Sequence, residues 1–347
     1  MFRTRLPARS AAFALVPGVA ISLALAAGGA TSAAAEDGDA LAPAAAEPYA
    51  EYVALGDSYS AGPLIPQQRP DMIGCLKSTN NYPAFVASYL GLATYTDVTC
   101  SGAETTDMRK PQETIVPGPA PKPQLDALTP TTDLVTLGIG GNDFGLFGSM
   151  ISDCEEVAAS DPKGAPCRDK YTVDGVDTKK RDARRIERRV ARVVREITAA
   201  APQADVFVVG YPRLLPTKGT CAEVPFAKGD YKWGNQVERI LNDSIRSAAA
   251  ENGATYINLY PASKGHDACG GDDAWINGSE LKPLEAANFH PYLRGMRGVS
   301  RSAFRQITGT PAPELEYATA LAGPELPPLT EEQLNYMAEM FLEYLNP

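Results

Sequence analysis

The feature that most restricts the fold of this chain is a set of short, almost wholly apolar runs, each followed directly by glycine. They occupy residues 52–55, 134–139 and 206–209. A strand with one face in water alternates between apolar and polar residues, whereas a strand covered on both faces is apolar nearly throughout. The runs therefore predict central strands of a parallel sheet that has helices on both faces.

Helical patterns lie between these runs. The clearest spans 182–200, where the surface opposite the apolar stripe is rich in arginine. Its apolar residues recur at i, i+4, i+7, i+8 and i+11, the spacing of one helix face: Ile186, Val190, Val193, Val194 and Ile197. We also expect helices over 81–92, 233–252 and the last part of 290–307, and short strands over 97–99 and 255–259.

Alternating strands and helices are typical of an α/β domain, which we place over residues 49–309. We predict a three-layer α/β/α sandwich with a mainly parallel central sheet. In such folds the functional residues lie at the carboxyl ends of the strands. The remaining long segments are expected to be irregular surface excursions: 59–80, 103–123, 144–178 and 211–232.

The first 35 residues have the layout of a secretory signal peptide. Arg3, Arg5 and Arg9 precede a mostly apolar stretch over 11–27, and small residues follow as far as Ala35. We expect cleavage near Ala35 and a secreted protein; the alternative is an uncleaved membrane anchor. Residues 36–48 are expected to form a linker.

The charge of the chain excludes one class of partner. Its formal charge is −10, and loss of residues 1–35, which hold three arginines and no acidic residue, would make it −13. Binding of nucleic acid through phosphate neutralisation needs a basic surface, so we expect no nucleic-acid partner.

Six cysteines in an exported chain suggest disulfides, and six cysteines allow 15 pairings. Their grouping into three sequential couples favours the pairs Cys75–Cys100, Cys154–Cys167 and Cys221–Cys269. The sequence has no C-x-x-C spacing, and the acidic residues near His266 make no convincing ligand set, so we expect no metal site.

The tail, residues 310–347, has seven glutamates and neither lysine nor arginine. It ends in the pattern of an amphipathic helix, carried by Leu334, Met337, Ala338, Phe341, Leu342 and Leu345. We favour a helix docked on its own domain, with the arginine-rich face of 179–195 as one docking place. The alternatives are a lid over an apolar site and a contact with a partner or a membrane.

Three strand ends carry residues suited to acyl chemistry. Ser58 follows the first apolar run, where its hydroxyl can attack a carbonyl group. Gly102 permits close backbone approach, and Asn142 places an amide donor on a tight turn. Together with the Ser58 and Gly102 N–H groups, that amide could stabilise a developing oxyanion. Each turn also has a plainer interpretation as a helix cap or a loop turn.

Any imidazole base must be one of two histidines. His290 lies late in the chain, before the last helix of the domain, and is better placed to meet the first strand end. His266 stands next to a cysteine that is expected to be in a disulfide, and we interpret it as structural.

In their order along the chain these segments resemble the SGNH (GDSL-like) hydrolase family, and with the paired cysteines they look most like its secreted actinobacterial lipases and esterases. The resemblance covers about residues 52–307. It implies an SGNH or flavodoxin-like fold, Ser58 as nucleophile and His290 as general base. It also implies an oxyanion hole made by the N–H groups of Ser58 and Gly102 and by the Asn142 amide.

One position departs from the family pattern. Many members have an aspartate three residues before the catalytic histidine, where it orients the imidazole; this chain has Ala287 there. Either a backbone carbonyl near Ala287 accepts the His290 Nδ1–H, which we favour, or Glu285 reaches back to it. A carbonyl fixes the tautomer but stabilises the imidazolium less than a carboxylate does.

We therefore expect a secreted serine carboxylic-ester hydrolase, a lipase or esterase that forms an acyl-enzyme and needs no cofactor. The alternatives are a phospholipase or a carbohydrate acetyl esterase on the same fold, and an inactive extracellular binding protein. We expect a monomer that takes a small-molecule or lipid ester and is compatible with transient contact with a lipid surface. Six residues near the expected cleft are candidates for an apolar acyl pocket, with core packing as the equal alternative: Tyr59, Leu64, Ile65, Phe144, Leu146 and Phe147.

Overall fold

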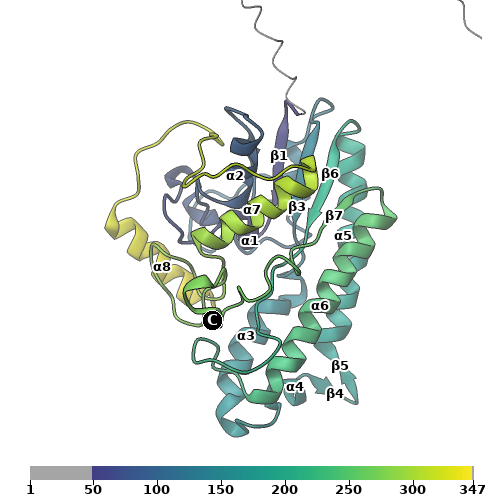
Figure 1. Ribbon diagram of the computed structural model, residues 1–347, viewed down its shortest axis with the longest axis vertical. Helices are drawn as coiled ribbons and strands as arrows, with labels where there is room; N and C mark the ends of the chain where they lie inside the picture. Colours follow the sequence, from purple (N-terminus) through teal and green to yellow (C-terminus); the bar gives the residue numbers. More distant parts are fainter. Residues whose placement is uncertain (1–48, 346–347) are drawn as a thin grey trace, which may run out of the picture. The chain divides into compact units, whose positions relative to one another are not determined.

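A five-stranded parallel sheet forms the centre of the protein (Figure 1). The structure, a computed structural model, describes residues 49–345. The strand order is β2-β1-β3-β6-β7, which is the flavodoxin-like order of doubly wound sheets. The strands are β1 (Tyr52–Gly56), β2 (Thr96–Asp97), β3 (Leu134–Gly138), β6 (Asp205–Val209) and β7 (Thr255–Ile257).

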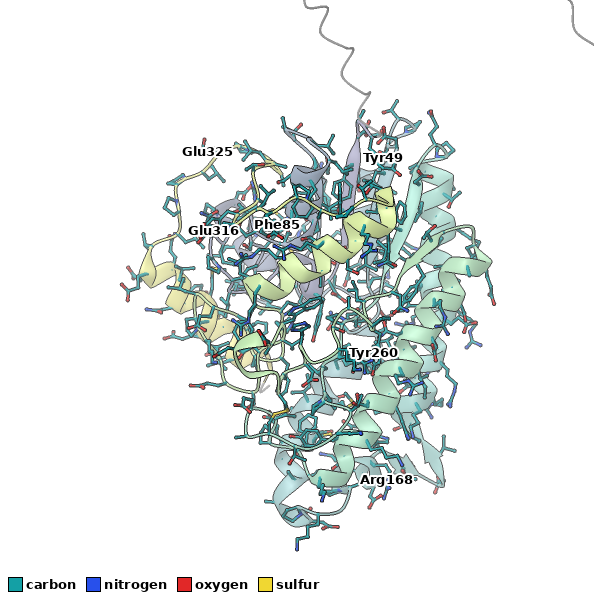
Figure 2. The ribbon with its side chains drawn as sticks, viewed as in Figure 1. Tyr49, Phe85, Arg168, Tyr260, Glu316 and Glu325 are labelled. Atoms are coloured by element: carbon teal, nitrogen blue, oxygen red, sulfur yellow. A yellow bond between two sulfur atoms is a disulfide. The ribbon has the colours of Figure 1, made fainter. Side chains whose placement is uncertain are left out.

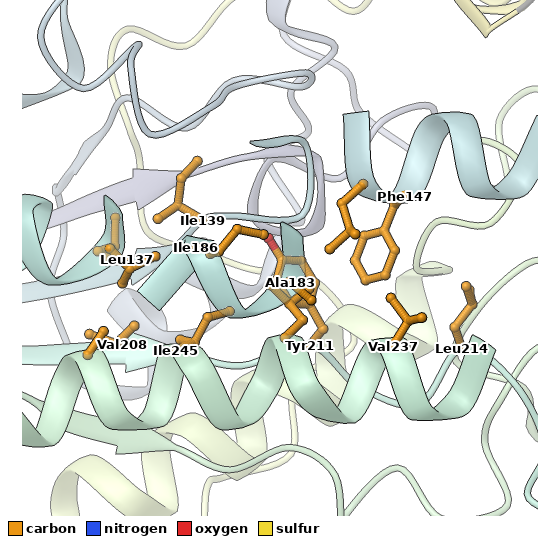
Figure 3. Close-up of a cluster of buried hydrophobic side chains, with 14 of the residues drawn as sticks. Leu137, Ile139, Phe147, Ala183, Ile186, Val208, Tyr211, Leu214, Val237 and Ile245 are labelled. Carbon is orange, nitrogen blue, oxygen red and sulfur yellow. The ribbon is translucent and has the colours of Figure 1, made fainter. Parts of the chain in front are cut away.

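The sheet is covered on both faces, as the apolar runs predict. Successive side chains of a strand point to opposite faces, and here they enter two different cores. Val53 and Leu55 of β1 pack with the layer of α5 (Thr178–Ala200) and α6 (Lys228–Glu251), part of which Figure 3 shows. Tyr52 and Ala54 pack with the layer of α2 (Tyr82–Tyr89) and α7 (Leu293–Thr308). Figure 2 places the side chains on this framework, with Phe85 of α2 in the second layer. The predicted three-layer α/β/α fold is confirmed.

The predicted helices are present, but two of them begin earlier than their apolar patterns do. α5 begins at Thr178, where Asp177 caps it by accepting a hydrogen bond from the Lys180 N–H. Its first turn is polar and carries no apolar period, so the pattern detects the helix only from the point at which it packs. α6 likewise begins at Lys228 rather than 233.

The expectation of an irregular segment at 144–178 is wrong. It contains α3 (Leu146–Val157), α4 (Pro166–Lys170) and a small antiparallel hairpin of β4 (Thr172–Val173) and β5 (Val176–Asp177). Leu146, Met150 and Cys154 follow a spacing of four residues and are buried in the first core, which is why α3 forms. Short 3₁₀ turns occur at Pro70–Cys75, Gln124–Ala127, Asp143–Gly145, Ala158–Ser160 and Gly271–Asp273.

All six cysteines lie in disulfides, in sequential couples: Cys75–Cys100, Cys154–Cys167 and Cys221–Cys269. The first joins the loop before α2 to the turn after β2. The second joins α3 to α4, and the third joins two loops outside the sheet. They therefore tie together segments that the sheet does not hold.

The tail ends in α8 (Glu331–Leu345), which docks on the body of the protein. The docking face is Met337, Ala338 and Phe341, and it packs against Leu64, Leu76, Ile115, Val116 and Ala287. Docking on the arginine-rich face of 179–195 is therefore a wrong expectation. The reason is that α8 presents an apolar surface, which is stabilised by an apolar partner rather than by charges in water.

Candidate active site

The carboxyl ends of the strands open into one cavity of about 170 Å³. Its lining includes Ser58, Gly102, Asn142 and His290, the four residues singled out in the sequence. Parallel strands bring their carboxyl ends to the same edge of the sheet, so residues up to 232 positions apart meet there.

Ser58 is the first residue of α1 (Ser58–Ala61) and is buried, with 5% of its surface exposed. Asp57 caps this short helix by accepting a hydrogen bond from the Tyr59 N–H at 2.9 Å. His290 enters from the loop before α7, and its Nε2 lies 2.8 Å from Ser58 Oγ. This is the distance across which a serine hydroxyl and an imidazole exchange a proton.

The second imidazole nitrogen corrects the sequence expectation. His290 Nδ1 lies 2.7 Å from the carbonyl oxygen of Asn288. The Ala287 carbonyl instead accepts from the His290 backbone N–H, and the Glu285 side chain is exposed. The favoured kind of partner, a main-chain carbonyl near Ala287, is present, but it is the carbonyl of the next residue, Asn288, rather than that of Ala287 itself. The reason is the sharp turn at Phe289, where φ is +54°, a conformation uncommon for a bulky residue.

Burial lowers the pKa of His290 to about 4, and its hydrogen bond to the Asn288 carbonyl raises it only in part. Desolvation disfavours the charged form of a base, so the imidazole is neutral at neutral pH. A neutral imidazole with Nδ1–H directed at a carbonyl has its lone pair on Nε2, facing the serine.

Donor groups face the same cavity from the neighbouring strand ends. Gly102 has φ +82°, which favours glycine, and its backbone lines the cavity. Asn142 donates one amide hydrogen to the Ala103 carbonyl at 3.0 Å. Since an amide nitrogen carries two hydrogens, the second is free of that bond. The buried Asp143 carboxylate holds the two loops together by accepting from the Thr105 N–H and hydroxyl, at 3.0 and 2.6 Å.

Tyr211 is a site residue that the sequence interpretation missed. Its hydroxyl donates to Asp57 Oδ2 at 2.5 Å and accepts from the Gly141 N–H at 2.7 Å. It therefore links the turn that carries the serine to the turn that carries Asn142. Burial raises the pKa of Asp57 to about 7. The available signal was position, because Tyr211 lies two residues after the end of an apolar strand, as Ser58 does.

Known proteins are similar to this chain over the region that contains the candidate active site. The GDSL-like Lipase/Acylhydrolase family matches residues 54–297. Lipase 2 of Streptomyces coelicolor is 40% identical over 265 residues, which is 73% of this chain and 84% of that protein. The chain belongs to the GDSL-like lipase/acylhydrolase family.

Solved structures agree with this membership. Phospholipase A1 from Streptomyces albidoflavus superposes with a TM-score of 0.62 at 29% identity, over 75% of this chain and 99% of that one. The extracellular lipase from Streptomyces rimosus gives a TM-score of 0.59 at 27% identity, over 73% and 97% of the two chains. As a member of this family the protein is an ester hydrolase of the lipase and esterase type, and its substrates are small-molecule esters.

The apolar lining of this GDSL-like site differs from the expected one. Of the six candidates, only Tyr59 and Phe147 line the cavity. Leu64, Ile65 and Leu146 are fully buried in cores, and the Phe144 ring lies under the Arg185 and Arg189 guanidinium groups. Residues that the sequence analysis did not assign to the pocket complete its apolar lining: Ile115, Ile151, Phe289 and Phe341.

His266 lies apart from this cavity, stacked on Trp275 with ring centroids 4.9 Å apart. Its Nδ1 lies 2.7 Å from the Asp273 carbonyl oxygen. Among residues 49–345, no three histidine, cysteine or acidic side chains are grouped so that they could hold a metal ion. In the same part of the chain, no helix combines the length and hydropathy needed to cross a bilayer.

Proposed function

We propose that this hydrolase cleaves carboxylic esters with Ser58 as nucleophile and His290 as general base. The observation that carries the proposal is the 2.8 Å separation of Ser58 Oγ and His290 Nε2 inside the cavity. A serine hydroxyl is a weak nucleophile at its ordinary pKa, and an adjacent neutral imidazole activates it.

The steps follow from the positions of the groups. As Ser58 Oγ bonds to the ester carbonyl carbon, its proton passes to His290 Nε2, and the carbonyl oxygen becomes an oxyanion. The imidazolium then protonates the departing alcohol oxygen, which leaves an acyl-serine. Water, deprotonated by the same nitrogen, cleaves the acyl-serine to release the acid and restore both side chains.

The oxyanion is stabilised by donors on three strand ends, namely the Ser58 N–H, the Gly102 N–H and the second amide hydrogen of Asn142. Their support is that all three residues line the cavity beside the serine hydroxyl. Fixed donors of this kind act at the atom where charge develops and do not reorganise during the reaction.

His290 works with a carbonyl rather than a carboxylate, so the pair forms a Ser–His dyad. The Asn288 carbonyl holds the ring orientation and the Nδ1–H tautomer. Because a carbonyl carries only a partial charge, it stabilises the imidazolium less than an aspartate would.

We further propose that the protein is secreted as a monomer. Three disulfides and the extracellular lipase of Streptomyces rimosus among its relatives support export. The proposed division is a signal peptide at 1–35, a linker at 36–48, a hydrolase domain at 49–309 and a tail at 310–347. The first two segments lie outside the described residues.

A phospholipid acyl ester is the second candidate substrate. Its support is the similarity to a protein named phospholipase A1, whose chain is covered to 99%. Hydrolysis of phospholipid vesicles, measured beside hydrolysis of a soluble ester, separates the two candidates.

The catalytic assignment is tested by substitution. Ser58→Ala and His290→Ala are each expected to lower kcat on p-nitrophenyl acetate by roughly 10³–10⁶-fold, and Asn142→Ala by about 10²–10³-fold. A fluorophosphonate probe should label the native protein and leave Ser58→Ala unlabelled. Native turnover by Ser58→Ala would remove the assignment, and failure of the native chain to label would favour an inactive binding protein.

A further inference from the structure

The C-terminal helix α8 (yellow in Figure 1) packs on the body of the protein, and one of its residues lines the catalytic cavity. Phe341 of α8 lines the cavity and is 1% exposed. Its ring meets the His290 ring nearly edge-on, with centroids 5.5 Å apart and planes at 79°. A residue from the end of the chain thus bounds the space in which the ester must sit.

The docking of α8 is built from apolar packing. Met337 and Ala338 are 0% and 5% exposed and lie beside Phe341 in one cluster with the body of the protein. The outward surface of the helix is acidic, because its four glutamates are exposed: Glu331, Glu332, Glu339 and Glu343. The helix therefore has one face that fits the cavity rim and another that suits water.

The segment that leads to α8 is tethered along the way. Leu321 pairs with the chain at 93–95, donating to the Ala93 carbonyl and accepting from the Tyr95 N–H at 3.0 and 3.1 Å. The N–H groups of Thr319 and Ala320 both donate to Ser88 Oγ, at 2.8 and 3.0 Å. These bonds fix the route of the tail as far as Leu321, ten residues before α8 begins.

The helix lies beyond the region that defines the family. The match to the GDSL-like family ends at residue 297, whereas α8 begins at Glu331. Helix α8 therefore lies outside the part of the chain that the family match covers.

With α8 docked, the cavity is small. Its volume of about 170 Å³ is close to that of an engineered protein cavity of about 150 Å³ that holds one benzene molecule. Common ligand pockets are larger, at about 300–1,000 Å³. A space of this volume accommodates about six non-hydrogen atoms, the size of a short acyl group.

We propose that α8 caps the active site and that Phe341 is a specificity-determining residue that sets the largest ester the capped site admits. The inference rests on the proposed function. Phe341 does not take part in bond making. It occupies the space into which a longer chain would extend from the serine.

The test compares kcat/KM for p-nitrophenyl octanoate and p-nitrophenyl acetate in the full-length protein. Phe341→Ala should raise the octanoate-to-acetate ratio by about tenfold or more, since pocket space for a few methylenes carries discrimination of that size. Phe341→Leu, which keeps apolar contact with the cluster and guards against a misfolded alanine variant, should raise it less. Phe341→Trp should lower it.

Two other residues of α8 serve as controls. Tyr336 is 43% exposed, so Tyr336→Ala should leave the ratio within about twofold of the native value. Met337 is buried in the same cluster but does not line the cavity, so Met337→Ala weakens docking without removing the Phe341 ring. A rise in Met337→Ala equal to that in Phe341→Ala would overturn the assignment of the size limit to Phe341.

The remaining outcomes separate this inference from the proposed function. If native activity depends on Ser58 but all three Phe341 variants keep the native ratio, the cap is wrong and the catalytic assignment stands. If the native protein hydrolyses neither ester, or Ser58→Ala is as active as the native chain, both are overturned.

Discussion

In the proposed mechanism, the protonation state of His290 sets the acidic limit of activity. There His290 must be neutral to accept the Ser58 proton, and burial lowers its pKa to about 4. For a base whose folded-state pKa is lowered, the neutral form persists as pH falls from the ordinary value of about 6.5 toward the folded value. In that window the unfolded chain binds more protons than the folded one, so stability also falls as pH falls.

We therefore expect kcat/KM for a neutral ester to stay nearly constant from about pH 7 to pH 5 and to fall only as the pH approaches about 4. A pH–rate profile on p-nitrophenyl acetate measures this. Asp57 and Glu104 are carboxyl residues that also line the cavity, so Asp57→Asn and Glu104→Gln are the controls and should keep the acidic limb. A limb near pH 6.5 that persists in Asp57→Asn would contradict the lowered pKa of His290, because Asp57, whose pKa is about 7, could otherwise account for it.

At the scale of elements, the site depends on how strand ends are held together. β1 and β3 are neighbours in the sheet, but the turns beyond them leave it and need their own link. Tyr211, directly beyond β6, supplies that link through Asp57 and Gly141. A side chain at Gly141 would approach the Tyr211 hydroxyl to 2.9 Å, so glycine is required for this contact.

Tyr211→Phe is expected to lower the free energy of unfolding by roughly 2–4 kcal/mol. The substitution leaves two buried groups, the Asp57 carboxyl oxygen and the Gly141 N–H, without the partner they share. It should also lower kcat, because the two turns lose their common anchor. Urea unfolding and ester hydrolysis measure the two effects.

The matched control is Tyr256→Phe, which removes a hydroxyl bonded to Asn242 Oδ1 at 3.0 Å, away from the catalytic cavity. It should lower the free energy of unfolding by about 1 kcal/mol and leave kcat unchanged. Equal losses of stability and rate in the two variants would show that Tyr211 is an ordinary buried tyrosine.

At the scale of the whole molecule, the disulfides join loops and helices that the hydrogen bonds of the sheet do not hold. Cys75–Cys100 is the bridge nearest in sequence to a proposed oxyanion donor, because Cys100 stands two residues before Gly102. The Ser101 N–H also donates to the Cys75 carbonyl at 2.9 Å. By contrast, Cys154–Cys167 ties α3 to α4, and Cys154 stands 12 residues after Asn142.

Replacing either bridge by alanines should lower the free energy of unfolding by about 2–4 kcal/mol, since each closes a loop in the unfolded chain. Only Cys75→Ala/Cys100→Ala should also lower kcat, measured at a temperature where both variants are folded. If the Cys154→Ala/Cys167→Ala variant loses as much kcat, the Cys75–Cys100 bridge has no particular role in placing Gly102.

The sequence by itself determined the parallel sheet, the α/β fold and the ester-hydrolase family, all of which are confirmed. It could do so because burial on both faces leaves apolar runs, and because functional turns follow strand ends directly. The roles of Ser58 and His290 stay predictions, although the two side chains meet at the expected place. The apolar runs and the turns at strand ends can be recognised in the sequence because each depends only on residues close together in the chain.

Only the tertiary structure decided which carbonyl accepts from His290, that Tyr211 joins two turns, and that Phe341 lines the cavity. The first depends on the left-handed turn at Phe289, which no residue preference indicates. The other two depend on contacts between residues far apart in the chain. Sequence spacing gives the face on which a side chain lies, but the packing of whole elements decides what that face meets.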